Sequence, residues 1–283
     1  MLKKYIGIEK TILVCYFKYC VGESEIMKYY DKLIKLKCFS FEEAEKICGN
    51  SRNAKSILRD YKNKGYITNV KRNLYVVLDL ETHEPTANKF EIASHITKNS
   101  YITHHSAFEY YGYSNQVYYE VYVSGSRFHE FEFGDVTYRY ISSPNDFGVI
   151  APTALIRITD KEKTLIDGIK DFEKIGGLEE LLKCIDSMPY IDQEKILNYL
   201  KKYGNHFLFQ KTGYILWHFK DNLSLDNNFF DVCKNYISKT KYYLSKEVRL
   251  NSKKAYLNKE WNLIVPNNFE DMLSKGAVKI ADL

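Results

Sequence analysis

The stretch from residue 40 to 78 constrains the fold most, because its helix and turn signals follow one another with almost no spare residues. Ser40 and Glu43 have the spacing of a capping box, in which each side chain bonds the backbone N–H of the other residue. Gly49 can take the left-handed conformation that ends a helix, and Asn50 can cap the next one. The spacing predicts two helices joined by a short turn, which is a helix-turn-helix.

The second helix of this pair, expected from Arg52 to Lys64, has two opposed faces. At 100° per residue the apolar stripe consists of Ala54, Ile57, Leu58 and Tyr61. The opposite stripe is Arg52, Ser56, Arg59 and Asn63, flanked by Ser51, Lys55 and Lys62. Arginine can form two parallel hydrogen bonds with guanine, asparagine can do the same with adenine, and lysine can neutralise a phosphate. We expect the central stripe to read bases and the flanking residues to contact phosphates, although a solvated helix face is often charged as well.

A hairpin is expected directly after this helix. Gly65 stops the helix, and residues 66–70 and 74–78 are rich in the β-branched and aromatic residues of strands. The turn between the strands is basic and consists of Lys71, Arg72 and Asn73. Helix, turn, basic helix and hairpin follow in the order of a winged helix-turn-helix, whose wing touches the DNA backbone or minor groove. We therefore assign residues 1–80 to a DNA-binding domain, with a first helix at about 23–35 and an extra helix over 8–19.

The remaining residues, 81–283, are expected to form a larger α+β domain. Residues 81–86 are polar and contain a proline, which is typical of a linker. A helix is expected over 88–96. Apolar residues alternate over 117–123, and turn signals at 124–125 and 134–135 predict an antiparallel β meander running to Ile141. A second capping box at Thr159 opens a series of helices.

The net charge of +5 is unevenly distributed. Residues 1–80 carry a net charge of +7, residues 81–233 carry −7, and residues 234–283 carry +5. Basic charge at both ends is typical of a protein that binds a polyanion. Exposed lysines on helix surfaces that bind nothing would give the same net charges, however. Six cysteines without a CxxC pair indicate reduced thiols in the cytoplasm. No apolar run is long enough to span a membrane.

Three segments resemble a known family. They are YITHHSAFEYYG at residues 101–112, RITDKEKTLID at 157–167 and Gly-Gly-Leu at 176–178. The second contains an Arg-x-x-x-x-Glu-Lys-x-Leu-x-Asp pattern. Together with the winged helix, these motifs resemble the AbiEi family, the antitoxins of AbiE abortive-infection toxin–antitoxin systems. The likeness in element order covers nearly the whole chain, to which the first forty residues and the long tail are additions.

The resemblance implies a repressor of its own operon that binds inverted repeats through the winged helix, and a dimer on the DNA is one arrangement that such repeats allow. It also implies that the second domain counteracts a nucleotidyltransferase-like toxin without forming a stable complex, in a type IV arrangement. No cofactor is implied, and the protein is not expected to be an enzyme.

Two groups of side chains could suggest other chemistry. His105 and Glu109 have helical spacing for a metal, but no third ligand has a recognisable spacing, so no metal site is expected. Lys161, Lys163 and the carboxylates of Glu162 and Asp167 could form a nuclease-like set, yet such charges are also ordinary at a capped helix start. The alternatives that remain are a DNA-tethered nuclease and a winged helix that binds protein.

Overall fold

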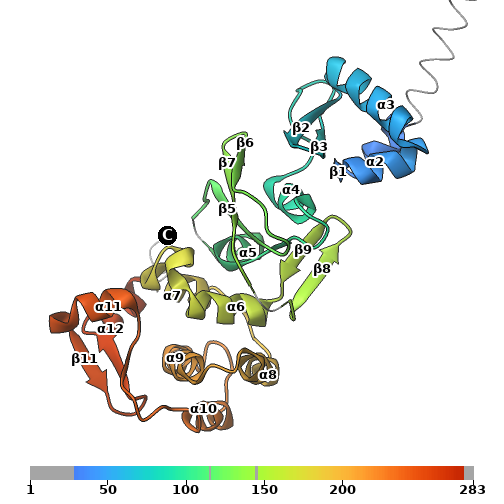
Figure 1. Ribbon diagram of the computed structural model, residues 1–283. Helices are drawn as coiled ribbons and strands as arrows, with labels where there is room; N and C mark the ends of the chain where they lie inside the picture. Colours follow the sequence, from blue (N-terminus) through green and yellow to red (C-terminus); the bar gives the residue numbers. More distant parts are fainter. Residues whose placement is uncertain (1–28, 115, 144–145, 277–283) are drawn as a thin grey trace, which may run out of the picture. The chain divides into compact units, whose positions relative to one another are not determined.

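The computed structural model describes residues 29–114, 116–143 and 146–276, and the chain divides into two compact units, 1–98 and 99–283 (Figure 1). Both units combine helices with β-sheet, so the predicted α+β class is correct. The helix expected over 8–19 and the first half of the one expected over 23–35 lie outside the described residues. Residues 29–33 are helical.

The first unit contains three helices and one sheet after residue 33. The elements are β1 (Cys38–Ser40), α2 (Phe41–Cys48), α3 (Ser51–Asn63), β2 (Ile67–Lys71), β3 (Leu74–Val77) and α4 (Lys89–His95). The sheet order is β1-β3-β2, and both pairings are antiparallel. The capping box expected at Ser40 is present, since the Ser40 hydroxyl accepts from Glu43 N–H at 3.2 Å and the Glu43 carboxylate accepts from Ser40 N–H at 2.8 Å.

The core of the first unit is formed where α3 meets the sheet and residues 29–33. Leu33, Phe39 and Tyr61 have no exposed surface, and Leu58 and Val77 are buried beside them. The α3 residues of this group are those that the helical repeat predicted to face inward. Burial of this stripe fixes which side of α3 remains in solvent.

The boundary between the units lies 18 residues after the predicted one. Residues 81–86 are not a free linker, because Thr86 N–H donates to the Val77 carbonyl at 2.9 Å and Leu78 forms a β-bridge with Pro85. The α4 helix contacts β1, and Lys37 Nζ lies 2.8 Å from Glu91 Oε1. The segment that looked like a linker therefore returns the chain to the first sheet.

The second unit contains the remaining elements. The strands are β4 (Tyr101–Ile102), β5 (Glu120–Ser124), β6 (Phe131–Phe133), β7 (Val136–Tyr140), β8 (Val149–Thr153), β9 (Ile156–Thr159), β10 (Tyr242–Tyr243), β11 (Ala255–Asn258) and β12 (Leu263–Pro266). The helices are α5 (His104–Tyr110), α6 (Lys161–Lys170), η1 (Phe172–Ile175), α7 (Leu178–Asp186), α8 (Gln193–Tyr203), α9 (His206–Trp217), α10 (Asn227–Lys234), α11 (Lys246–Leu250), η2 (Ser252–Lys254) and α12 (Phe269–Gly276).

The larger sheet of this unit is mixed, so the predicted antiparallel meander is wrong. Its order is β6-β7-β5-β4-β9-β8, and β5 pairs in parallel with β7, as β4 does with β9. The turn at Gly134 joins β6 to β7 as an antiparallel hairpin, and β7 rather than β6 lies next to β5. Tyr138 is buried at this pairing. Alternation in sequence defines the two faces of a strand but not its neighbour.

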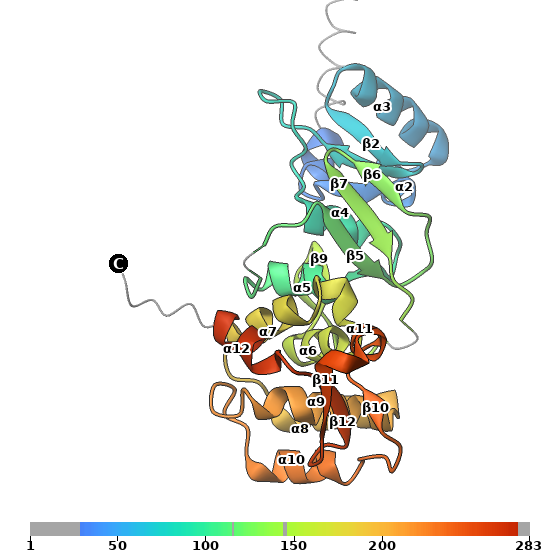
Figure 2. The same cartoon turned by 90° about the vertical axis from the view of Figure 1, so that its left-hand side faces the viewer.

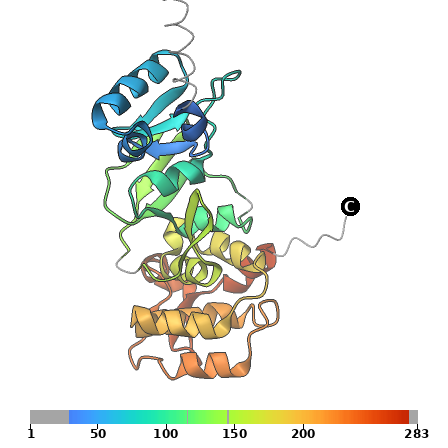
Figure 3. The same cartoon turned by 90° about the vertical axis from the view of Figure 1, so that its right-hand side faces the viewer.

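The helical part of the second unit packs around α6, α8 and α9, with a small second sheet beside them (Figures 1 and 2). Figure 3 shows the layer of α8, α9 and α10, coloured orange, from the other side. The small sheet has the order β10-β12-β11. Trp261 joins it to α9, since Gln210 donates to the Trp261 carbonyl at 2.6 Å and any side chain at Gly213 would collide with the indole. No helix within the described ranges is long and apolar enough to cross a membrane.

Candidate nucleic-acid interface

The α3 helix presents a polar face that its packing leaves in solvent. Asn50 caps the helix by accepting from Asn53 N–H at 2.9 Å, and Gly49 before it has a φ of 88°. Ala54, Leu58 and Tyr61 face the core. Six of the seven residues predicted on this helix are exposed, namely Arg52, Lys55, Ser56, Arg59, Lys62 and Asn63, and Ser51 is half-buried.

The cations of this face are not neutralised by neighbouring acids. Arg52, Lys55, Arg59 and Lys62 form no ion pair with any residue that the structure describes. The single acid of α3, Asp60, lies 3.2 Å from Lys64 Nζ, so its charge is offset on its own side of the helix. The face is therefore positive and offers free guanidinium and amide groups, which are the groups that contact bases and phosphates in a major groove.

The hairpin turn between β2 and β3 presents the other predicted residues. Arg72 and Asn73 are exposed, and Asn73 has a φ of 63°, a left-handed conformation that asparagine tolerates better than most residues. The Asn73 carbonyl accepts a hydrogen bond of 3.0 Å from Phe41 N–H at the start of α2. The turn is thus tied to α2, not to the face of α3.

Lys71 differs from its two neighbours at the turn. It is half-buried at the end of β2, where it pairs with Leu74, and burial lowers the pKa of its ammonium group. Arg72 consequently carries the exposed charge of the turn. The residue pattern does not predict this difference, because it depends on the shift in strand register between Asn69 and Lys71.

Asn53 belongs beside the predicted face and was missed. Its side chain is exposed in the first turn of α3, next to Arg52. Recognition helices commonly contact bases with their first residues, so this position in the helix was the available signal. Lys46, in the last turn of α2, is an exposed cation of the same unit that the sequence pattern did not single out.

The Lys161–Asp167 group in the second unit has a different environment. Lys163 has no exposed surface, and its ammonium nitrogen lies 3.1 Å from Asp167 Oδ2 and 2.8 Å from the Tyr203 hydroxyl. The capping box predicted at Thr159 is wrong, because Thr159 ends β9 and Asp160 is the N-cap of α6, where it accepts from Lys163 N–H at 2.8 Å. Asp160 also accepts from the Tyr199 hydroxyl at 2.7 Å. The Lys163 ammonium group is thus paired with buried side chains, which leaves no open position for a substrate phosphate at Lys163.

Glu162 completes this network on the surface side of α6. Lys195 of α8 bonds the Glu162 carboxylate at 2.8 Å and the Asp160 carboxylate at 3.1 Å. The pKa of Lys195 is raised; burial alone would lower it, but the two carboxylates outweigh that effect. The RITDKEKTLID motif at residues 157–167 therefore joins α6 to α8, which is a structural use of its charges.

His105 and Glu109 do not come together with further ligands. His105 Nε2 lies 3.1 Å from the Ser114 hydroxyl, and the imidazole packs against Tyr118 with ring centroids 3.7 Å apart. Within the described ranges, no three side chains of histidine, cysteine, aspartate or glutamate are placed to hold a metal ion.

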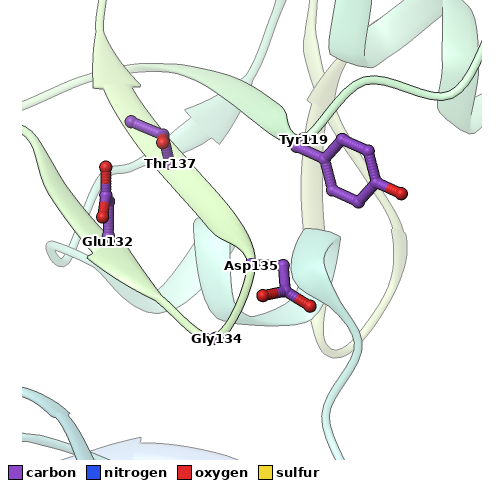
Figure 4. A pocket seen from close by; sticks show the side chains of 5 residues that line it. All are labelled: Tyr119, Glu132, Gly134, Asp135 and Thr137. Carbon is purple, nitrogen blue, oxygen red and sulfur yellow. The ribbon is translucent and has the colours of Figure 1, made fainter.

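An open pocket of about 460 Å³ lies at the β6–β7 hairpin. Tyr119, Glu132, Gly134, Asp135 and Thr137 line it, and Figure 4 shows Tyr119 and Asp135 on one side of the turn and Glu132 on the other. Its two carboxylates would repel phosphate groups. This pocket therefore does not extend a nucleic-acid surface.

Comparison with known proteins gives a fold but no family. No family model and no curated protein matches the chain. The RV2827C protein of Mycobacterium tuberculosis has a similar fold in its crystal structure, with a TM-score of 0.54 and 12% sequence identity. The similarity covers 84% of this chain and 88% of that one, so it extends over both units. At this identity the likeness concerns the fold alone.

Proposed function

We propose that the first unit is a winged helix-turn-helix that binds double-stranded DNA, with α3 in the major groove and the β2–β3 turn on the adjacent backbone. The observation that carries this proposal is the exposed face of α3, on which Arg52, Arg59 and Asn63 have no acidic partner. The order of α2, α3 and a two-stranded hairpin supports it. The net positive charge of residues 1–80 provides the electrostatic attraction to phosphates that such binding needs.

In this proposal Arg52, Ser56, Arg59 and Asn63 read base edges. Ser51, Lys55 and Lys62, which lie along one edge of this stripe, contact phosphates. Arg72 and Asn73 touch the backbone, with Lys71 contributing less because it is half-buried. Phosphate contacts position the protein, and base contacts give it sequence preference.

We further propose that the protein is a cytoplasmic antitoxin that represses its own operon, and that it is not an enzyme. The support is the resemblance to the AbiEi family in the motifs at 101–112, 157–167 and 176–178. The burial of Lys163 and Asp167 agrees with a non-catalytic second unit. By the same resemblance, the DNA sites would be inverted repeats and the opposing toxin a nucleotidyltransferase-like protein that forms no stable complex.

The testing experiment is a gel-shift titration of the full chain against the DNA upstream of its own operon. Unrelated competitor DNA is present in excess, and the titration is repeated at two salt concentrations. A discrete complex that survives competitor and weakens with salt is the expected result. Absence of any complex at micromolar protein would leave the α3 face as a solvated surface. Binding that is weak and indifferent to salt would instead favour a winged helix that binds protein.

A further inference from the structure

A second basic surface lies in the other unit, on α11 and η2. These elements connect β10 to β11 in the small sheet (Figure 1). Lys246, Arg249, Lys253 and Lys254 are all exposed there, and none forms an ion pair with a residue that the structure describes. Glu247 is the one acid between residues 239 and 259. Four unpaired cations in nine consecutive residues make a concentrated positive site.

Next to these cations lies a cavity of about 240 Å³. Leu178, Val248 and Pro266 contribute apolar walls, whereas Asn251, Lys254 and Asn268 contribute polar groups. Lys254 therefore belongs both to the basic surface and to the cavity. Glu247 also lines the cavity, so one negative group faces the same space.

The two amides of the cavity are available for recognition. Asn251 and Asn268 are exposed, and neither side chain bonds to any residue within the described ranges. An asparagine amide carries one acceptor and two donor hydrogens, the combination found on the edges of nucleobases. Apolar walls with a few polar groups suit a flat, partly polar ring better than they suit a metal ion or a free phosphate.

Leu250 adds a feature that simple solvation does not require. Its side chain is 76% exposed and lies among the four cations. Proteins that bind single strands combine a basic surface with side chains that contact unstacked bases, most often aromatic rings. The cations at 246–254 fit this combination, whereas a purely solvated helix face needs no exposed leucine.

From these observations we infer that α11, η2 and the adjacent cavity bind single-stranded nucleic acid. Lys246, Arg249 and Lys253 hold consecutive phosphates, and one unstacked base enters the cavity between the apolar walls and the two amides. A duplex does not fit this description, because its bases are paired and stacked. The inference concerns the second unit and does not depend on DNA binding by α3.

The test is fluorescence anisotropy with the full chain and labelled strands of about 12 nucleotides, of mixed sequence, as RNA and as DNA. The variant Lys246→Ala/Arg249→Ala/Lys253→Ala should weaken binding about tenfold or more. It should also lower the slope of log K against log salt by about 2, since each lost phosphate contact removes roughly 0.7. Asn251→Ala/Asn268→Ala should weaken binding without changing that slope, and Glu247→Gln should tighten it.

The matched control is Arg127→Ala/Lys201→Ala/Lys202→Ala, which removes three exposed cations from the same unit. This control should bind as the unchanged protein does. A preference for RNA or for DNA would identify the natural strand, and either one supports the inference. An equal loss in the control, or no anisotropy change for either strand, would overturn it. The variant Arg52→Ala/Arg59→Ala should retain strand binding, so a failure of operator binding remains distinguishable.

Discussion

The ammonium group of Lys163 lies 3.1 Å from the carboxylate of Asp167, one helical turn further along α6, and the lysine side chain has no exposed surface. The Tyr203 hydroxyl of α8 bonds both groups. Burial, together with the Asp167 charge, raises the pKa of Tyr203, so the phenol keeps its proton. Thr103 reaches the same carboxylate from the end of β4 at 3.3 Å. One buried charge pair thus joins α6 to elements on both sides of it.

Lys163→Met should destabilise the protein by about 3–5 kcal/mol, because it leaves the Asp167 carboxylate buried without its partner. Replacing both residues, as Lys163→Met/Asp167→Leu, should cost clearly less than the single change. The control is Lys183→Met, which breaks the partly exposed Lys183–Glu179 pair of 3.1 Å and should cost less than about 0.5 kcal/mol. Urea unfolding of the full chain measures all three. Equal effects for the buried and exposed lysines would contradict the role given to the pair.

Gly49→Ala should destabilise the first unit by about 1 kcal/mol. Nothing lies within 4 Å of a Cβ placed at this position, so the cost comes from its φ of 88° and not from a collision. Gly49→Asn should cost less, because asparagine tolerates the left-handed conformation. Thermal unfolding compares the two, and the conclusion fails if asparagine is the worse residue.

Lys211 should contribute a gain in stability between pH 8 and about 10.5, against an opposite contribution above about pH 9 from Cys38, Cys184 and Cys233, whose pKa burial raises to about 12. Burial lowers the pKa of this lysine to about 8 from its usual 10.5. Between these values the unfolded chain holds a proton that the folded chain has lost, so raising the pH favours folding by up to about 3 kcal/mol. Below pH 8 Lys211 is protonated in both the folded and the unfolded chain, so its contribution to the free energy of unfolding no longer changes with pH.

Lys211→Met should abolish that contribution and so make the unfolding free energy fall more steeply, or rise less, between pH 8 and 10.5 than in the unchanged protein. The change also removes a 3.1 Å hydrogen bond to the Lys170 carbonyl and the contact of the ammonium with Phe172. The slope of the unfolding free energy against pH is therefore the quantity to measure. Lys183→Met serves as the surface control, and its slope should match that of the unchanged protein.

Arg59→Ala should cost roughly 1–3 kcal/mol of binding free energy on the operator and little on random DNA, if the arginine reads a base. The exposed guanidinium has no ion pair among the described residues, so its removal should leave the fold intact. Gel shifts on both DNAs give the comparison. Equal losses on the two would remove Arg59 from base reading and leave it a phosphate contact.

Arg72→Ala should weaken binding to all DNA about equally and reduce the salt slope by about 0.9, as expected for one phosphate contact. Lys71→Ala should change the slope less, because Lys71 is half-buried whereas Arg72 is exposed. Titrations at several salt concentrations separate the two. A larger effect at Lys71 would mean that the strand end rearranges on DNA.

Local signals in the sequence predicted the first unit well. The helix expected from Arg52 to Lys64 is observed as Ser51–Asn63, and the hairpin strands agree to within a residue or so. Capping residues and glycines act within a few positions, so they are readable without knowledge of the fold. The strand β1 was missed because it has three residues and exists only through pairing with the distant β3.

The second unit was harder because its structure depends on pairing between distant segments. Strand β7 pairs in parallel with β5, and the alternation of residues in the two strands does not predict this pairing. The β11–β12 hairpin was hidden in a stretch that read as a basic tail, since its strands have four residues each. Of the candidate site, the sequence predicted which side chains face solvent on α3. It could not predict that Lys71 is half-buried.

The hydrogen bond from Phe41 N–H to the Asn73 carbonyl means that the length of α2 sets the distance between the hairpin turn and the start of α3. One end of this eight-residue helix holds the hairpin turn, and the other leads within two residues into α3. The length of α2, about 12 Å, then sets how far apart the two parts of the proposed interface stand. Side chains on α3 can be exchanged without altering that span. The sequence preference of α3 and the distance between the two contacts on the duplex can therefore evolve separately in this chain.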